Sequence, residues 1–320
     1  ISNTQYHIQL AIIEKTIYRV RDGVIIKVLR APLHFWRNET ISFKSAYTGE
    51  VYHENIPTVK AFHRKGTKTK KRDMKSTILL YLLCRFGLYG TLERFGLTKD
   101  DICFTSDLHP DKTNYECFMC KPNVFLSVKR TQFKNFITKR IVASLLYMLR
   151  FFQKTADGYT IEMLNDVECR WWKVILGKYC YGMSVKPAMA INHAEPHLAS
   201  VSTLLDAITK RALNRINIPC ENIYDMFQQV FVNLDDWLVN HQSNDLYDKK
   251  IGVLESLLSD IVKSTFTRFY DQSRQQKIIT AKSIRRLLKM HNKSISRIYI
   301  NSMVRCNPSI YNDNWLLSIG

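Results

Sequence analysis

Two cysteines at metal-ligand spacing, Cys117 and Cys120, are the first residues of this chain whose types and spacing could do chemistry. A two-residue gap lets both thiolates bind one tetrahedral zinc ion, and His109 and Cys103 lie upstream as further ligands. Strong zinc patterns contain a second pair at regular spacing, whereas this region offers only an irregular set. Two interpretations stay open: a zinc site at Cys117/Cys120, or cysteines that fill a core and hold no metal.

The paired carboxylates of Asp235 and Asp236 are the second candidate. Such pairs can bind magnesium and organise phosphoryl transfer, which would make the chain a metal-dependent nuclease. A helix edge or cap explains the same two residues without catalysis. The sequence contains neither a glycine-rich phosphate loop nor an Asp-x-Asp-x-Asp run. We therefore assign no catalytic residue and no metal ligand to this chain.

A basic run between residues 60 and 75 is the third candidate. Its cations are Lys60, Arg64, Lys65, Lys68, Lys70, Lys71, Arg72 and Lys75, opposed only by Asp73. Flexible cations at this density can neutralise several phosphates without selecting a sequence, although a solvated surface loop has the same composition. We expect nucleic-acid contacts from Lys65, Lys68, Lys70, Lys71 and Arg72.

The overall composition favours the polyanion interpretation of this run. The 320 residues carry a formal charge of +19, with a pI near 9.6, so that counterion release favours nucleic acid as a partner. No membrane partner is expected, because no apolar stretch could span a bilayer and no signal peptide opens the chain. Eight scattered cysteines indicate reduced thiols rather than a disulfide scaffold, and we expect an intracellular protein.

The elements that must position these residues follow from periodicity and turn signals. Short β-rich runs (9–13, 24–28 and 40–43) are separated by turn pairs at Asp22-Gly23 and Thr48-Gly49. A run that is apolar on almost all sides, from Ser76 to Gly87, indicates a buried helix with a glycine C-cap. Residues 101–123 lose periodicity and are interpreted as a long loop or a small excursion from the fold.

Helical periodicity dominates the second half of the chain. One apolar face runs from Phe133 to Phe152. Further helices are expected at 161–176, 200–213 with Ser200 as N-cap, 223–232 and 251–270. The 46% hydrophobic content can bury a core, and the sequence predicts an elongated α+β chain. We expect a strand-containing domain at 1–190, which includes the basic run, and a mainly helical region at 191–320.

Four stretches in one order carry a resemblance to a known family. They are the basic run with Ser76-Thr77-Ile78-Leu79-Leu80, then Asn244 to Leu258, Thr280-Ala281-Lys282-Ser283-Ile284 and Asn312-Asp313-Asn314-Trp315. In order and character they resemble segments of the second-largest (β-type) subunit of multisubunit DNA-directed RNA polymerases. The stretch from about residue 100 to 200 matches poorly. The resemblance implies an N-terminal to middle portion of that subunit, similar to the split β subunits of large (jumbo) bacteriophages.

The family resemblance also implies an architecture and contact residues. Residues 1–190 would form a lobe-like domain, and residues 191–320 a protrusion- or fork-like region. Asn244, Lys249 and Lys250 fall where relatives contact DNA at the downstream edge of the bubble. The family has a pair of basic residues that includes arginine in this segment, whereas this chain has two lysines. Lysine cannot form the bidentate contacts of arginine, so we expect phosphate contact rather than base recognition there.

Partners and location follow from the same resemblance. The chain would help to form the DNA channel and hold downstream DNA, with template strand, non-template strand, RNA and other polymerase subunits as partners. The remaining β portion and β'-type chains would be separate, and Mg²⁺ would be bound by a partner subunit rather than by this chain. The location would be the host cytoplasm or a phage nucleus-like compartment. Two alternatives stay open: a stand-alone basic nucleic-acid-binding scaffold protein, and a metal-dependent nuclease.

Overall fold

The computed structural model describes residues 6–8, 11–14, 17–20, 22–27, 32–60, 75–153, 158–182, 184–205, 207–214, 218–240, 249–252, 280–282 and 303–305. The chain forms two compact units, one of residues 16–244 and one of residues 1–15 with 245–320. Strands and helices are both present, so the expected α+β class is confirmed. Residue 190, where we expected a domain division, lies within a helix of the larger unit. The lobe-like and fork-like assignment stays a prediction.

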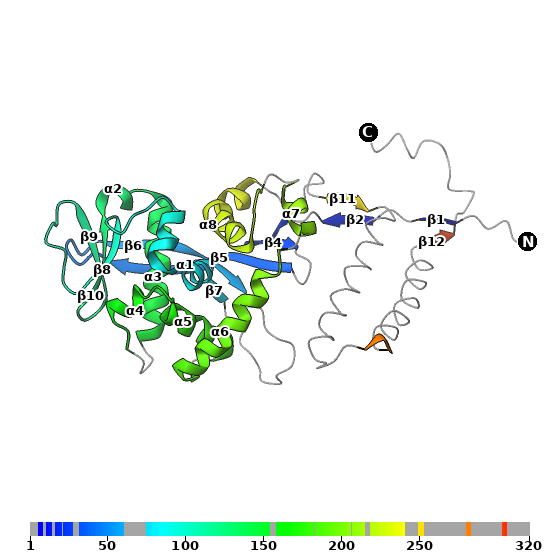
Figure 1. Cartoon of the computed structure of the whole chain (residues 1–320). Coiled ribbons are helices and arrows are strands. Elements are labelled where there is room, and N and C mark those ends of the chain that lie inside the picture. The colour runs from blue at the N-terminus through cyan, green and yellow to red at the C-terminus, as the bar shows by residue number, and fades with distance from the viewer. Residues whose placement is uncertain are drawn as a thin grey trace, which may run out of the picture. The chain divides into compact units, whose positions relative to one another are not determined.

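A five-stranded antiparallel sheet forms the N-terminal part of the larger unit (Figure 1). Its strands follow in sequence order: β3 (Ile17–Val20), β4 (Gly23–Lys27), β5 (Pro32–Lys44), β6 (Val51–Lys60) and β7 (Lys75–Thr77). The turn expected at Thr48-Gly49 joins β5 to β6 and is confirmed. A turn also joins β3 to β4 as expected, but it lies one residue earlier than Asp22-Gly23, because Gly23 is in β4 and pairs with Val20. Gly49 has a φ of +76°, which glycine adopts at no steric cost.

The buried helix expected after the basic run is present as α1 (Ile78–Arg94), in which all residues from Ile78 to Cys84 are buried. Its expected end at Gly87 is wrong. Gly87 interrupts the helix with φ 69° and ψ −174°, a conformation that is essentially restricted to glycine, and the helix then resumes. Resumption is favoured because Leu88 and Leu92 continue the buried face.

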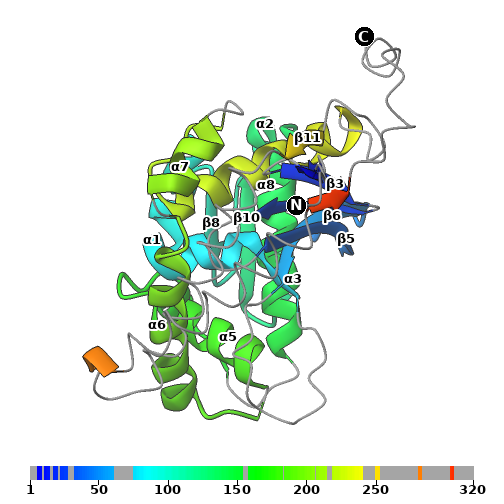
Figure 2. The same ribbon diagram turned by 90° about the vertical axis from the view of Figure 1, so that its right-hand side faces the viewer.

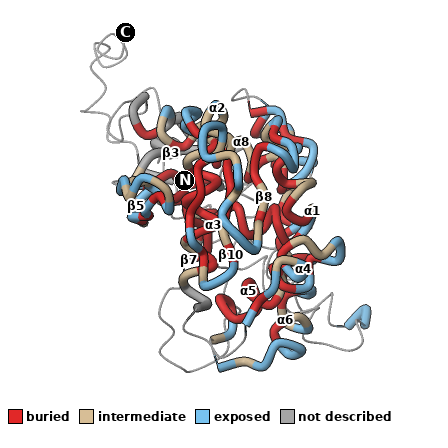
Figure 3. Tube along the Cα trace, turned by 90° about the vertical axis from the view of Figure 1, so that its left-hand side faces the viewer, coloured by how far each residue is buried: buried red, intermediate tan, exposed pale blue. Residues whose placement is uncertain are grey.

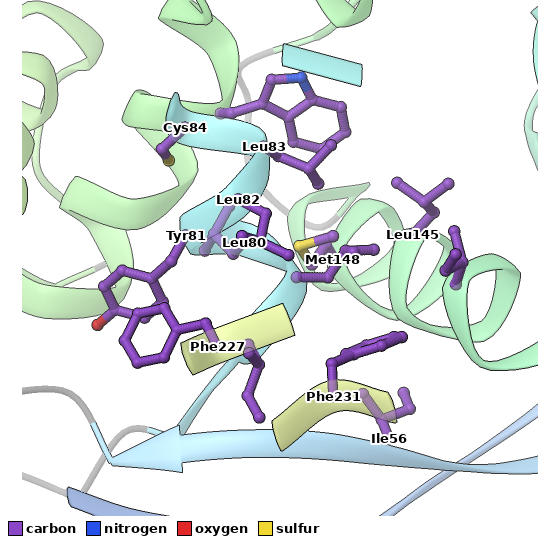
Figure 4. Packing of buried hydrophobic residues seen from close by; sticks show 14 of the residues in the cluster. Ile56, Leu80, Tyr81, Leu82, Leu83, Cys84, Leu145, Met148, Phe227 and Phe231 are labelled. Carbon is purple, nitrogen blue, oxygen red and sulfur yellow. The ribbon is translucent and has the colours of Figure 1, made fainter. Parts of the chain in front are cut away.

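The core of the larger unit lies between α1, the sheet and two long helices, α3 (Phe136–Gln153) and α8 (Ile223–Asn240). Both helices were expected from their apolar faces. Figure 4 shows Leu80 of α1 near Met148 of α3, with Phe227 and Phe231 of α8 nearby above Ile56 of β6. All these side chains are fully buried.

The other helices of the larger unit are α2 (Arg130–Phe133), α4 (Ile161–Leu164), α5 (Arg170–Tyr181), α6 (Pro187–Ser202) and α7 (Ala207–Asn214). The single helix expected over 161–176 is therefore divided, and Cys169 adopts a left-handed φ of 58° at the start of α5. The helix expected over 200–213 is confirmed only in its second half, where α7 lies. Its expected start is wrong, because Ser200 lies inside α6 rather than at an N-cap.

Helix α6 continues through Pro196 although proline removes one backbone hydrogen bond. Close packing against α5 supports it. A Cβ atom added at Gly177 of α5 would lie 2.1 Å from the carbonyl oxygen of Ala190 in α6, so only glycine permits this approach. Ala190, Ala194 and Val201 of α6 are buried along the same helix.

A second, three-stranded antiparallel sheet replaces the long loop expected over residues 101–123, and that prediction is wrong. Its order is β8-β10-β9, with β8 (Ile102–Thr105), β9 (Tyr115–Lys121) and β10 (Val124–Lys129). The polar stretch between β8 and β9 hid the strand pattern. Asn123, with a φ of 59°, forms the tight turn between β9 and β10, and asparagine tolerates this conformation better than most residues.

The smaller unit joins the two ends of the chain through antiparallel strand pairs. β1 (Tyr6–Ile8) pairs with β12 (Met303–Arg305), and β2 (Ala11–Glu14) pairs with β11 (Lys249–Gly252). The helix expected from Ile251 is wrong at its start, because Ile251 and Gly252 belong to β11, and residues 253–270 lie outside the described residues. Within the described parts of the chain, no helix has the length and apolar character to cross a bilayer.

Candidate nucleic-acid interface

The basic run connects two strands whose ends pair with each other. Lys60, the last residue of β6, lies opposite Lys75, the first residue of β7. The ladder continues with Val59 opposite Ser76 and Thr58 opposite Thr77. The predicted contacts Lys65, Lys68, Lys70, Lys71 and Arg72 belong to the connection of residues 61–74, which lies outside the described residues. The structure thus fixes where this connection begins and ends.

The base of the connection is part of the core. Thr58, Ser76 and Thr77 are fully buried, and α1 begins at the next residue. Within α1, the Tyr81 hydroxyl lies 3.1 Å from Nε2 of His197 in α6, which ties the helix to a further element. Because the anchors are packed, we expect that substitutions within residues 61–74 change charge without disturbing the core.

The net positive charge of the chain is concentrated in two segments. Residues 60–75 contain eight basic and one acidic residue, and residues 262–305 contain eleven basic and one acidic residue. The other 260 residues contain 28 basic and 26 acidic residues. Phosphate binding depends on the local density of cations, so the two segments are the candidate polyanion contacts. The second was missed because its cations are spread more thinly, although counting charges along the sequence finds it.

Many cations of the described surface already have acidic partners. Ion pairs join Arg94 to Asp225, Lys129 to Asp101, Arg130 to Glu116, Arg170 to Glu168, Lys173 to Glu195 and Lys210 to Glu221. The exposed pair Arg170–Glu168 contributes little to stability, but all six pairs, exposed or partly buried, reduce the local positive potential. The paired cations of the folded body leave the basic run as the stronger candidate for polyanion contact.

The predicted contacts Lys249 and Lys250 lie on β11 of the smaller unit. In the antiparallel register Lys249 is opposite Glu14, and Lys250 is opposite Ile13. Asn244 lies outside the described residues. The two lysines thus occupy a strand, rather than the loop before a helix that the family resemblance implies.

The cysteines of the zinc hypothesis lie three residues apart on β9, where side chains alternate between the two faces of the sheet. Cys120 joins the hydrophobic core, and burial raises the pKa of its thiol to about 12. Cys117 lies on the other face, with Sγ 3.2 Å from the hydroxyls of Tyr47 and Ser127. This placement does not bring the two thiols to one ion. Nor does any cluster of three or more His, Cys, Asp or Glu suited to a metal occur among the described residues.

The carboxylate of Asp235 forms ion pairs with two arginines. Arg37 Nη1 lies 2.7 Å from Oδ1, and Arg140 pairs with Oδ2. The Arg140 side chain is fully buried, donates to the carbonyl oxygen of Phe231 at 2.7 Å, and has its pKa lowered to about 10 by burial. Asp235 thus acts as the counterion of a buried guanidinium. Charge neutralisation of Arg140 thus accounts for an acidic residue at this position without a bound magnesium ion.

Tryptophans can stack on bases, but at helical spacing with apolar neighbours they are more often core residues, and two of them lie in the core here. Trp171 and Trp172 of α5 are buried, and Nε1 of Trp172 donates to the carbonyl oxygen of Leu164 at 3.1 Å. Base stacking requires an exposed ring face, so neither indole is a nucleic-acid contact. Trp237 and Trp315 lie where the structure describes no side chain.

Comparison with known proteins supplies the wider assignment. A family model described as a non-virion RNA polymerase subunit matches residues 1–307, which include strands of both compact units and the anchored basic run. No curated protein matches the chain. An RNA polymerase subunit takes part in transcription together with other subunits of that enzyme. The chain belongs to the non-virion RNA polymerase subunit family.

Proposed function

We propose that the chain is a noncatalytic, β-type subunit of a DNA-directed RNA polymerase that helps to form the DNA channel and holds nucleic acid by its phosphates. Family membership supplies the enzyme complex. The β-type assignment is supported by the collinear stretches, of which Asn244 to Leu258 is the longest. In this proposal the remaining β portion, the β'-type chains and the catalytic Mg²⁺ belong to partner subunits.

The pairing of Lys60 with Lys75 is the observation that carries the phosphate-binding role. Six basic residues and one acid lie between these two anchors. Since both anchors lie opposite each other on neighbouring strands, the connection that carries these cations begins and ends at the same end of the β6–β7 ladder. Many cations elsewhere on the described surface are paired with acids, so a polyanion would bind preferentially at this loop.

Binding through this loop would be independent of nucleic-acid sequence. Five of its cations are the predicted contacts, and four of those are lysines, whose compact charge reaches phosphates without the fixed fork of arginine. Asn244, Lys249 and Lys250 are the second proposed contact, and an asparagine amide can also pair with a base edge. The two contacts lie in different compact units.

The test is the salt dependence of template binding by the assembled polymerase that contains Lys68→Ala, Lys70→Ala, Lys71→Ala and Arg72→Ala. Each lost phosphate contact lowers the log–log salt slope by about 0.9 on duplex DNA or about 0.7 on a single strand. Loss of all four contacts therefore predicts a slope lower by roughly 3 to 4.

A matched variant controls for total charge. Lys99, Lys112, Lys134 and Lys186 are exposed on the folded body, and their replacement by alanine removes the same charge elsewhere. We expect the control to leave the slope nearly unchanged. An unchanged slope in the loop variant, or an equal change in both variants, contradicts the assignment.

The division of labour has its own test. The isolated chain should synthesise no RNA on a primed template with Mg²⁺, whereas the assembled polymerase should. RNA synthesis by the isolated chain would show that the catalytic metal ligands are present in this chain.

A further inference from the structure

Strand β6 has one edge that is only partly covered. β5 pairs with it from Val51 to Val59, but on the other side β7 pairs only with Thr58 to Lys60. After Thr77 the chain leaves the sheet and enters α1. Among the residues that the structure describes, no strand continues beside Val51 to Asn55. The open edge therefore begins where β7 ends.

The register shows which backbone groups point to this edge. In an antiparallel pair, residues alternate between those that bond the partner strand and those whose N–H and C=O point away. The Ser45 amide bonds the Glu50 carbonyl oxygen at 2.9 Å, whereas the Ser42 carbonyl oxygen accepts from Arg150 on the side away from β6. It follows that residues 52 and 54 of β6 bond β5, and residues 51, 53 and 55 point outward.

Side-chain contacts agree with this assignment. Non-hydrogen-bonded pairs have the closer side chains, and Ser42 Oγ lies 2.8 Å from His53 Nδ1. Thr40 Oγ1 likewise donates to Asn55 Oδ1 at 2.8 Å. Pro57 occupies the next outward position, where proline costs no bond within the sheet.

The open stretch is accessible on the larger unit. Val51, His53 and Asn55 are all exposed, and Val51 keeps 51% of its surface. In Figure 2, β5 and β6 lie at the margin of this unit, on the side away from α6 and α7. Figure 3 shows exposed residues along the trace near β5, in contrast to the buried trace of α1 and α3. A strand could therefore approach without displacing a described element.

We infer that the edge of β6 from Val51 to Asn55 binds an extended segment of another polymerase subunit as an added strand. Three outward N–H groups and three outward carbonyl oxygens, with a period of two residues, match the main chain of an extended segment. Other subunits are the partners that family membership provides. The inference rests on that membership and not on phosphate binding by the basic run.

Hydrogen exchange at single-residue resolution tests the inference on the unmodified protein. In the isolated chain, the amides of Val51, His53 and Asn55 should exchange fast and those of Tyr52 and Glu54 slowly. In the assembled polymerase all five should be slow. Fast exchange of the three outward amides in the assembly overturns the inference, and so does their protection in the isolated chain, which would mean that this chain covers its own edge.

Proline substitution gives a second, independent test. His53→Pro removes an outward N–H and keeps the bonds to β5, so the chain should fold and co-purify with the other subunits about tenfold less or worse. His53→Ala keeps the N–H and should co-purify normally. Glu54→Pro removes an inward N–H and should unfold the hairpin. Normal co-purification of folded His53→Pro would overturn the inference.

Failure here is distinguishable from failure of the proposed function. The variant with four alanines at residues 68, 70, 71 and 72 should assemble normally, because its changes lie in the connection and leave β6 intact. His53→Pro, reconstituted at high subunit concentration, should keep the wild-type salt slope. A loss of assembly in the alanine variant, with normal assembly of His53→Pro, would place the subunit contact in the basic run instead.

Discussion

Replacement of Asp235 by alanine should destabilise the larger unit strongly, whereas replacement of its neighbour Asp236 should not. Asp235 is the partner of Arg140, whose side chain is fully buried between α3 and α8. Removal of the carboxylate leaves a buried guanidinium with the Phe231 carbonyl oxygen and without its direct ion pair, so that only the less direct charges of Glu54 and Asp236 still oppose it. Asp236 is exposed, and no described ion pair contains it.

The magnitude follows from the burial of each partner. Breaking a buried pair by removal of one partner costs about 3–5 kcal/mol. The lower end applies, because Asp235 keeps 22% of its side-chain surface and the second pair, to Arg37, is 40% exposed on the arginine. A loss of about 3 kcal/mol corresponds to a midpoint lower by roughly 6–12 °C for a unit of this size. Asp236→Ala should stay within about 0.5 kcal/mol.

Thermal and urea unfolding of the two single variants, compared with the native chain, measure these differences. The double variant Arg140→Met/Asp235→Leu should recover most of the loss, because apolar replacement of a buried pair is often neutral. Equal midpoints for Asp235→Ala and Asp236→Ala would refute the counterion role. A midpoint of the native chain that rises with Mg²⁺, but not in Asp235→Ala, would instead support a metal site.

Three further predictions concern other parts of the fold. Burial raises the pKa of Glu54, so its ionised form is disfavoured in the folded state. Glu54→Gln should therefore raise the unfolding midpoint at pH 7, and the difference should vanish below the ordinary glutamate pKa of 4.5, where folded and unfolded states are both protonated. Gly87→Ala should cost about 1–3 kcal/mol because of its φ of 69°, whereas Gly90→Ala, inside the helix, should change stability by less than about 1 kcal/mol in calorimetry. Mass spectrometry after brief alkylation should find Cys120 unmodified, since burial raises the pKa of its thiol to about 12. Metal analysis should find the same zinc content in the native chain and in Cys117→Ser, because Cys117 binds no zinc.

Much of the local structure could be predicted because it depends on neighbouring residues. The apolar run after the basic segment predicted α1, and the Asp22-Gly23 and Thr48-Gly49 pairs predicted two hairpin turns. The second sheet was missed because β8 and β9 are separated by a polar stretch that interrupts the alternation. Pro196 in the sequence argues against an intact helix around it, but packing of α6 against α5 outweighs one lost backbone bond.

The contacts that decide the role of a residue were harder to predict. Asp235 and Arg140 lie 95 residues apart in sequence, and no local pattern indicates that they meet. The spacing of Cys117 and Cys120 suits zinc only where the backbone turns. Both residues lie on one strand here, and their thiols point to opposite faces of the sheet. The basic run was found from sequence alone, but the pairing of its ends at Lys60 and Lys75 required the structure.

The pairing of Lys60 with Lys75 also sets a distance limit. The chain leaves β6 after Lys60 and enters β7 at Lys75, with 14 residues between. Each of these residues is therefore at most about seven residues along the chain from the nearer anchor. At about 3.3–3.6 Å per residue, chain length alone limits these residues to roughly 25 Å from the Lys60–Lys75 pair. A crosslink from Lys65, Lys68, Lys70 or Lys71 to nucleic acid in an assembled polymerase would therefore limit the distance between the Lys60–Lys75 pair and the phosphate backbone.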